Sequence, residues 1–255
     1  MNTILGVDIG GSGIKGAPVD LALGDLAEER FKVLTPQPAT AVAVAAEVRQ
    51  VAGHFDLPGG PDLPGAPVGV TFPGVVTNGT IRTAANVDKS WIGVNAEELL
   101  GDTLHCPVTV LNDADAAGIA EMTFGAGRDR YGTVLLLTFG TGIGSALFSN
   151  RQLVPNTELG HLELNGCEAE SHTSAKARED AGLSWKEWAP RVAEYLAYLE
   201  MLFSPELFII GGGVSRKADR FLDAIHGVRA EVVPAQLQNN AGIVGAAMAA
   251  ASRKV

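Results

Sequence analysis

The sequence predicts an α/β fold, and three observations support that prediction. Apolar runs of strand length alternate along the chain with longer segments of helical composition, as in sheets flanked by helices. Three of the apolar runs end in glycine-rich turns, at residues 10–13, 140–144 and 211–213. With 255 residues, 46% hydrophobic and 19% charged, the chain is long enough for one large or two smaller domains with proper cores.

The expected elements follow from these runs in order. Strands are predicted at residues 4–9, 14–19, 68–72, 108–111, 133–139, 145–148 and 207–210. Helices are predicted at residues 40–54, 96–104, 112–122, 184–203, directly after residue 213, and in the small-residue stretch 239–255. Ser184 and Glu187 have the spacing of a capping box at the start of one helix, and Pro205 ends that helix.

Two strand–turn–strand units resemble each other and suggest an internal duplication. VDIGGSGIKGAPV and LTFGTGIGSALF each combine an apolar strand, a Gly/Thr/Ser turn and a second apolar strand. We therefore expect two lobes, residues 1–111 and 112–238, with the helix at 239–255 packing back onto the first lobe.

The first of these turns has the spelling of a dinucleotide-binding motif. Gly11 to Gly16 read G-x-G-x-x-G, which in that motif opens a helix facing the pyrophosphate. Here Gly16 and Pro18 disfavour a helix directly after the turn. We expect the chain to return as a second strand, so that the turn forms a β-hairpin.

Glycine turns at strand ends let backbone N–H groups approach an anion, because no Cβ is in the way. Ser12 and Thr141 add hydroxyl donors to two of them. The three turns together favour a phosphate site over glycines that only make turns. A P-loop is excluded, because no lysine of this chain follows a glycine.

Composition limits the partners and the compartment. The net charge of −10 argues against general binding to nucleic acid or to a membrane surface. Two cysteines, Cys106 and Cys167, give no disulfide framework and fit a reducing cytoplasm. The N-terminus lacks the pattern of a signal peptide, and the apolar run at 241–251 is too short to span a bilayer. A cytoplasmic protein is expected.

Two acidic positions at strand ends are candidates for phosphate chemistry. Asp8 would repel phosphate unless it holds a cation, directly or through water, so it predicts Mg²⁺; the alternative is a turn-capping aspartate. Asp113, after Asn112, is either a helix N-cap or a general base that takes the proton from an attacking hydroxyl.

Glu158 and His161 form an acid–imidazole pair in a glycine-containing loop, followed by Glu163 and Glu170. Such side chains bind the vicinal hydroxyls of a sugar, although a surface pair without a function is the alternative. Zinc is a further alternative, with His161, Cys167 and His172 as ligands, but no C-x-x-C supports it.

In this order, DIGGSGIKG, NDADAAG, TFGTGIG, ELGH and IIGGG resemble the ROK family of sugar kinases, within the actin/hexokinase/Hsp70-like ATPase superfamily. Longer strings, such as TAANVDKSWIG and NNAGIVGAA, are similar to its polyphosphate-using bacterial members. The resemblance covers nearly the whole chain. It implies a two-lobed actin-like (ribonuclease H-like) fold of the hexokinase/ROK type, with the active site in a cleft between lobes that close on substrate.

The resemblance also implies roles for individual residues. Asp113 matches the catalytic base, and the sugar ligands are Asn86, Asn112, Asp113, Glu158, His161 and Glu170. The first phosphate motif of the family matches Asp8, Gly10, Gly11, Ser12, Gly13 and Lys15. The second phosphate motif, within residues 138–144, matches Thr138, Gly140, Thr141 and Gly142. The loop on the nucleoside side matches Gly211, Gly212 and Gly213.

One region departs from the family pattern. Most ROK kinases carry a cysteine cluster after the E-x-G-H motif, where this chain reads LNGCEAESHTS with Cys167 alone. The structural zinc of the wider family is therefore not expected. Glu170 takes the place of the final, sugar-binding glutamate of that cluster, and Glu168 is the alternative for the same position.

The implied activity is phosphorylation of glucose, or mannose, at the 6-hydroxyl, with inorganic polyphosphate and ATP as donors and Mg²⁺ as cofactor. Candidates for a basic track that holds polyphosphate are Lys15, Arg82, Lys89, Arg216 and Lys217. The family default is a homodimer. A strictly ATP-dependent hexokinase of other sugar specificity is the main alternative. A sugar-responsive repressor is expected less, because its DNA-binding helices would precede the strand that starts at residue 4.

Overall fold

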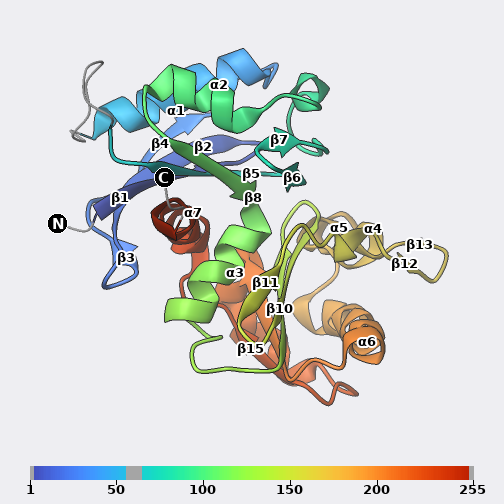
Figure 1. Ribbon diagram of the computed structural model, residues 1–255. Helices are drawn as coiled ribbons and strands as arrows, with labels where there is room; N and C mark the ends of the chain where they lie inside the picture. The colour runs from blue at the N-terminus through green and yellow to red at the C-terminus, as the bar shows by residue number, and fades with distance from the viewer. Residues whose placement is uncertain (1–2, 56–64, 253–255) are drawn as a thin grey trace. The chain divides into compact units, whose positions relative to one another are not determined.

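The computed structural model describes residues 3–55 and 65–252 (Figure 1). The chain divides into two compact units, Met1–Ala120 with Asn240–Val255, and Glu121–Asn239. The sequence predicts a division at residue 111, whereas the first turns of the helix that follows belong to the first unit. The reason is a close contact between Ala116 and the C-terminal helix, where a Cβ on Gly245 would overlap the Ala116 backbone.

The first unit contains a six-stranded sheet with the order β3-β2-β1-β5-β8, and β4 pairs with β2. Its strands are β1 (Thr3–Ile9), β2 (Gly13–Asp20), β3 (Asp25–Leu26), β4 (Phe31–Leu34), β5 (Val68–Phe72) and β8 (Val108–Asn112). Strands β2, β3 and β4 run antiparallel to their neighbours, whereas β5 and β8 are parallel to β1. Two short strands, β6 (Val76–Thr77) and β7 (Thr80–Ile81), form a separate hairpin.

The glycine turn between β1 and β2 forms the expected β-hairpin. Ile9 and Ile14 are paired across it, and the Gly10 N–H donates to the Gly13 carbonyl oxygen at 3.0 Å. The prediction of a strand after the G-x-G-x-x-G stretch is confirmed, which excludes the dinucleotide-binding interpretation.

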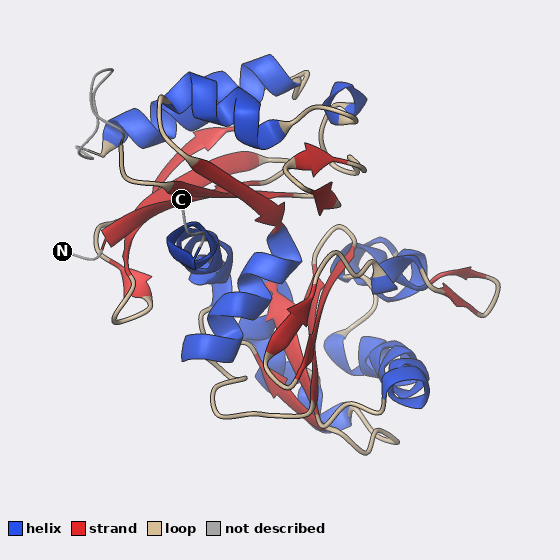
Figure 2. Ribbon diagram, viewed as in Figure 1, coloured by secondary structure: helices blue, strands red, loops and turns tan. Residues whose placement is uncertain are grey.

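Helices cover both faces of this sheet (Figure 2). On one face lie α1 (Ala41–His54) and α2 (Ala96–Leu104), and on the other α7 (Ala241–Ser252) and the start of α3 (Asp113–Phe124). The α7 helix approaches very closely, because a Cβ on Gly6 or Gly69 would overlap its backbone at Ile243 or Ala246. The short distance between helix and sheet therefore explains why α7 consists mainly of small residues. Of the predicted helix at 239–255, residues 253–255 lie outside the described part of the chain, and 238–240 form a 3-10 turn.

The second unit contains a five-stranded sheet with the order β11-β10-β9-β14-β15. Its strands are β9 (Thr133–Phe139), β10 (Ile143–Ser149), β11 (Gln152–Val154), β14 (Leu207–Gly212) and β15 (Glu231–Pro234). As in the first unit, a central strand has an antiparallel hairpin partner on one side and two parallel strands on the other. The expected internal duplication is thus present in the strand order.

The main helix of the second unit is α6 (Trp185–Phe203). Its capping box is confirmed, because Ser184 and Glu187 each accept from the other's backbone N–H. Trp188 and Tyr195 pack from α6 onto Phe139 of the sheet. The shorter elements are η2 (Leu159–His161), β12 (Glu163–Leu164), β13 (Cys167–Glu168), α4 (Ala169–Thr173), α5 (Ala175–Asp180), η3 (Gly213–Arg220) and η4 (Leu222–Ala224).

The structure bears on two further expectations about helices, one after residue 213 and one about membrane spans. The helix predicted after residue 213 is the 3-10 segment η3, interrupted by non-helical backbone at Lys217. Among the helices of residues 3–55 and 65–252, none has the length and apolar character needed to cross a membrane.

Candidate active site

In the first unit, a row of polar side chains crosses the sheet at the start of the glycine hairpin. Asp8 lies opposite Lys15 on one neighbouring strand and opposite Thr71 on the other. Lys15 Nζ is 2.9 Å from Asp8 Oδ2, and the Thr71 hydroxyl donates to Asp8 Oδ1 at 2.6 Å. Both carboxylate oxygens have protein partners, so Asp8 suits a cation held through water better than one bound directly.

The same hairpin lies against the segment that contains Asn86. A Cβ on Gly11 would be 3.0 Å from the Asn86 carbonyl oxygen and 3.1 Å from its Cβ. The Asn86 segment leads into η1 (Lys89–Trp91), where buried Trp91 donates through Nε1 to the Ala39 carbonyl oxygen at 3.1 Å. The first unit therefore brings Asn86 and the predicted phosphate turn together.

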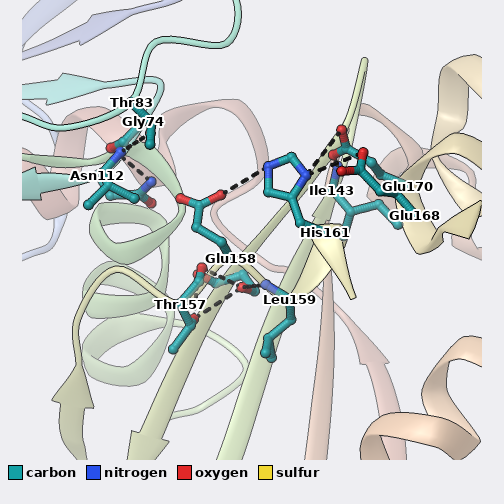
Figure 3. A network of polar contacts seen from close by, with 12 residues as sticks. Gly74, Thr83, Asn112, Ile143, Thr157, Glu158, Leu159, His161, Glu168 and Glu170 are labelled. Atoms are coloured by element: carbon teal, nitrogen blue, oxygen red, sulfur yellow. Dashed lines mark hydrogen bonds and ion pairs between the residues drawn. The ribbon is translucent and has the colours of Figure 1, made fainter. Parts of the chain in front are cut away.

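Asn112 and Asp113 have different roles at the start of α3. Asn112 is buried, and its Oδ1 accepts from the backbone N–H groups of Ala114 at 2.8 Å and Asp115 at 3.1 Å. Its Nδ2 donates to the Gly74 carbonyl oxygen at 3.2 Å (Figure 3). This is the pattern of an N-cap, so Asn112 caps the helix. Of the two interpretations left open for Asp113, the N-cap therefore does not apply.

In the second unit, three carboxylates surround His161 (Figure 3). His161 Nε2 is 3.7 Å from Glu158 Oε2, and Nδ1 is 3.5 Å from Glu168 Oε2 and 3.9 Å from Glu170 Oε1. The imidazole can donate a hydrogen bond and the carboxylates can accept them, so the cluster can both donate to and accept from sugar hydroxyls.

Burial raises the pKa of the Glu158 carboxyl above its ordinary value of 4.5, and the negative charge of Glu170 adds to the shift while His161 opposes it. An ionised Glu158 is therefore poorly solvated. A ligand that donates hydroxyl hydrogens to this carboxylate would replace the missing water.

Glu170 is also bound to the second glycine hairpin. The Ile143 N–H donates to its Oε2 at 3.0 Å, and a Cβ on Gly142 would collide with the same oxygen. A Cβ on Gly160 would lie 3.2 Å from it. The side chain of Glu170 is 27% exposed, compared with 58% for its competitor Glu168. Glu170 is thus the more firmly positioned of the two.

A buried serine that the sequence analysis missed holds the Glu158 loop. Ser145 Oγ donates to the Thr157 carbonyl oxygen at 2.6 Å and accepts from the Leu159 N–H at 3.0 Å. Thr157 returns a bond to the Ser145 carbonyl oxygen at 3.0 Å. The available signal was a single hydroxyl in the otherwise apolar second strand of the TFGTGIGSALF hairpin.

The second hairpin also lies against the third glycine loop. The Gly140 N–H donates to the Gly142 carbonyl oxygen at 2.9 Å, closing the turn as in the first hairpin. Thr138 pairs with Gly144 on one side and with Gly211 on the other. The second unit therefore places the predicted phosphate turn beside residues 211–213.

The zinc alternative is wrong for the ligands proposed from sequence. His161, Cys167 and His172 do not lie close enough together for all three to reach one ion; within residues 3–55 and 65–252, His161, Glu168 and Glu170 do. Cys167 instead donates its S–H to the Leu164 carbonyl oxygen, because it lies in the two-residue strand β13.

Among the candidates for a basic track, Lys15 lies in the first hairpin, in contact with Asp8. Arg82 follows β7 and Lys89 begins η1, both in the first unit, and Arg216 and Lys217 lie in η3 of the second. A further cation, Lys32, lies against Gly13 of the first hairpin and was not among the sequence-based candidates.

Comparisons with known proteins agree with these local features. Residues 4–177 match the model of the ROK family. The polyphosphate glucokinase of Mycobacterium tuberculosis is 54% identical over 245 residues, which cover 96% of this chain and 89% of that protein.

Two solved structures extend the comparison to the fold. The inorganic polyphosphate/ATP-glucomannokinase from Arthrobacter sp. strain KM matches with a TM-score of 0.91, at 53% identity over 98% of both chains. A ROK family glucokinase from Streptomyces griseus, solved with glucose and AMPPNP, matches with a TM-score of 0.83 at 27% identity, over 98% of this chain and 100% of that one. The predicted actin-like fold of the hexokinase/ROK type is confirmed. By the family model and by these relatives, the chain belongs to the ROK family.

Proposed function

We propose that this protein transfers a phosphoryl group to the 6-hydroxyl of glucose, with inorganic polyphosphate and ATP as donors and Asp113 as general base. One observation carries the proposal. Over 96% of its length the chain is 54% identical to a polyphosphate glucokinase, and the match to the ROK family model, residues 4–177, includes both glycine hairpins and the Asn112-Asp113 pair.

The glycine hairpins supply the donor side of the proposed reaction. Backbone N–H groups at residues 11–13 and 141–142 stabilise the negative charge on the phosphoryl group as it is transferred. Lys15 adds a positive charge beside the first hairpin. Mg²⁺, when bound, would neutralise further charge on the donor phosphates, with Asp8 as its contact through water.

Asp113 supplies the acceptor side. As the 6-oxygen of glucose attacks the terminal phosphorus, Asp113 takes the hydroxyl proton. The new O–P bond forms while the bond to the bridging oxygen breaks, so that ADP or a polyphosphate shortened by one unit leaves. Asn112 forms the cap of α3, and Asp113 is the first residue of that helix, where its Oδ1 accepts from the Ala114 N–H at 2.9 Å.

The sugar ligands of the proposal come from both units. Asn86, Asn112 and Asp113 belong to the first unit, and Glu158, His161 and Glu170 to the second. A complete set of the proposed ligands therefore needs residues of both units.

The donor and sugar specificity can be tested in one matrix of coupled assays. Initial rates are measured for glucose, mannose, fructose and an N-acetylated amino sugar, each with polyphosphate and with ATP. We expect glucose to be the best acceptor, mannose to be accepted, and both donors to work, by analogy with the Arthrobacter polyphosphate/ATP-glucomannokinase. Activity with ATP alone would overturn the polyphosphate part of the proposal and favour an ATP-dependent hexokinase.

The proposal includes a homodimer in the cytoplasm, the assembly and compartment that the family resemblance implies. Sedimentation equilibrium gives the mass in solution directly. A single species at the mass of one 26.5 kDa chain would overturn the dimer.

A further inference from the structure

We propose that Lys32 is a second cation of the donor site, one that binds polyphosphate beyond the phosphoryl group being transferred. The inference rests on the proposed function and names a residue that the sequence motifs do not mark. It concerns one edge of the first unit, where β4 extends the sheet next to the glycine hairpin.

The pairing of strands places Lys32 in the row that holds Asp8. In β2 and β4, Lys15 and Lys32 lie directly opposite each other. Lys15 in turn lies opposite Asp8, with which it forms an ion pair. Residues directly opposite each other across adjacent strands point to the same face. The row therefore reads Lys32, Lys15, Asp8, Thr71 across four strands.

Lys32 also covers the turn itself. A Cβ on Gly13 would lie 3.2 Å from Lys32 Nζ and would overlap its Cε. The ammonium group thus lies over the end of the glycine turn whose N–H groups are proposed to bind phosphate. The hairpin is fixed in place there, because Thr35, just after β4, donates its hydroxyl to the Gly10 carbonyl oxygen.

The charges of this row are unbalanced. Like charges directly opposite each other in an antiparallel pair destabilise the sheet. Asp8 balances the charge of Lys15, whereas no carboxylate of residues 3–55 or 65–252 forms an ion pair with Lys32. An anion in contact with both ammonium groups would remove the repulsion. In a protein with a net charge of −10, two facing lysines at a phosphate turn indicate such an anion.

The geometry favours polyphosphate over a nucleotide as the anion that uses Lys32. A nucleotide continues from its phosphates into an uncharged nucleoside, which the family resemblance assigns to the loop 211–213. A polyphosphate is charged at every unit and gains from each further cation along its path. Arg30, just before β4, continues the positive charge and donates to Asn240 at 3.4 Å, and Glu28 and Glu29 end the run.

The test compares Lys32→Ala and Lys32→Arg with the wild-type protein and with Lys186→Ala. Lys186 is an exposed lysine on α6 and serves as the matched control for loss of one charge. Equilibrium binding of an end-labelled long-chain polyphosphate is measured over a series of salt concentrations. Apparent KM values for polyphosphate and for ATP are measured in parallel, and thermal unfolding verifies that each variant is folded.

We expect Lys32→Ala to weaken polyphosphate binding about three- to tenfold at low salt and to reduce the slope of log affinity against log salt by about 0.7, the value for one lost contact to a single-stranded polyanion. The KM for ATP should change less than about twofold, because ATP lacks the further phosphates. Lys32→Arg should retain the wild-type slope, and Lys186→Ala should not differ from wild type.

An unchanged salt slope in folded Lys32→Ala would overturn this inference, as would an equal loss for both donors. Failure of the proposed function looks different, because the wild-type protein itself would then not phosphorylate glucose from polyphosphate. If the wild-type protein binds polyphosphate without using it, the binding slopes still decide the role of Lys32. If it does not bind polyphosphate, both proposals fall.

Discussion

At the scale of single residues, Glu158 and Glu170, both proposed sugar ligands, illustrate two ways of holding a carboxylate in place. Glu170 accepts from the Ile143 N–H and occupies space that only glycine leaves free at position 142. Glu158 is partly buried beside His161, and its loop is fixed by Ser145. A side chain held in this way loses little conformational entropy when it binds.

Replacing Glu158 by Gln should stabilise the protein at pH 7. The pKa of Glu158 is raised, so the folded state binds this proton more tightly than the unfolded state does. The stabilisation from the protonated form is complete below the ordinary value of 4.5 and is lost as the pH rises through the raised pKa. The variant should therefore unfold at a higher temperature than wild type at pH 7, with the difference shrinking toward pH 4.

The same variant should bind glucose about tenfold more weakly or worse at pH 7, since hydrogen bonds to a charged acceptor are lost. Calorimetric unfolding and glucose titration measure the two effects. Glu163→Gln, at an exposed neighbouring carboxylate, is the control. Lower thermal stability of Glu158→Gln at pH 7 would contradict the assignment of a partly buried, poorly solvated charge.

At the scale of elements, the close approach of α7 to the first sheet depends on glycines in two strands. A Cβ on Gly69 would overlap the backbone of Ala246, and one on Gly6 would overlap that of Ile243. Backbone atoms cannot move aside as the end of a flexible side chain can. The position of α7 therefore limits what these strand positions accept.

Replacing Gly69 by Ala should lower the free energy of unfolding by about 1–3 kcal/mol or more, the usual cost of overpacking. Gly53→Ala is the matched control, because its Cβ would meet no atom within 4 Å. In α1 that change should stabilise by about 0.5–1 kcal/mol. Urea unfolding measures both. A Gly69→Ala protein as stable as wild type would show that α7 lies farther from the sheet.

The elements that the sequence predicts are those with a local cause. Ser184 and Glu187 are three positions apart, and Gly16 with Pro18 excludes a helix within one segment, so the α6 cap and the first hairpin follow from short stretches. The two-residue strands β3, β6 and β7 are too short to show any period. The 3-10 segment η3 has a composition that also suits an α-helix.

In the candidate site, too, the sequence predicts the residues that lie in local patterns and misses those that depend on distant contacts. Asp113, Glu158 and His161 lie in recognisable local patterns, and the sequence predicts them. Thr71 and Lys32 matter through cross-strand partners, and Thr71 is 63 positions from the aspartate that it contacts. Ser145 matters through Thr157 and Leu159 in the loop that carries Glu158. These contacts depend on strand register and loop placement, which a single sequence does not specify. The N-cap role of Asn112 instead of Asp113 likewise required the hydrogen bonds to be seen.

At the scale of the whole molecule, one strand order occurs twice, and each copy has a glycine hairpin at the end of its central strand. The proposed reaction uses one hairpin from each copy, with the base at the start of α3 in the first unit. Neither unit holds a complete set of the proposed ligands. Activity should therefore require the intact chain.

The most direct test is the rate of glucose 6-phosphate formation from long-chain polyphosphate by wild-type protein and by Asp113→Asn, with glucose binding measured on both. We predict robust turnover for the wild type and a loss of about 10²- to 10⁴-fold for the variant, the usual contribution of a general base. The dissociation constant for glucose should change by less than about tenfold, because Asp113 is one of several proposed ligands. Near-normal turnover by a folded Asp113→Asn protein would contradict the account.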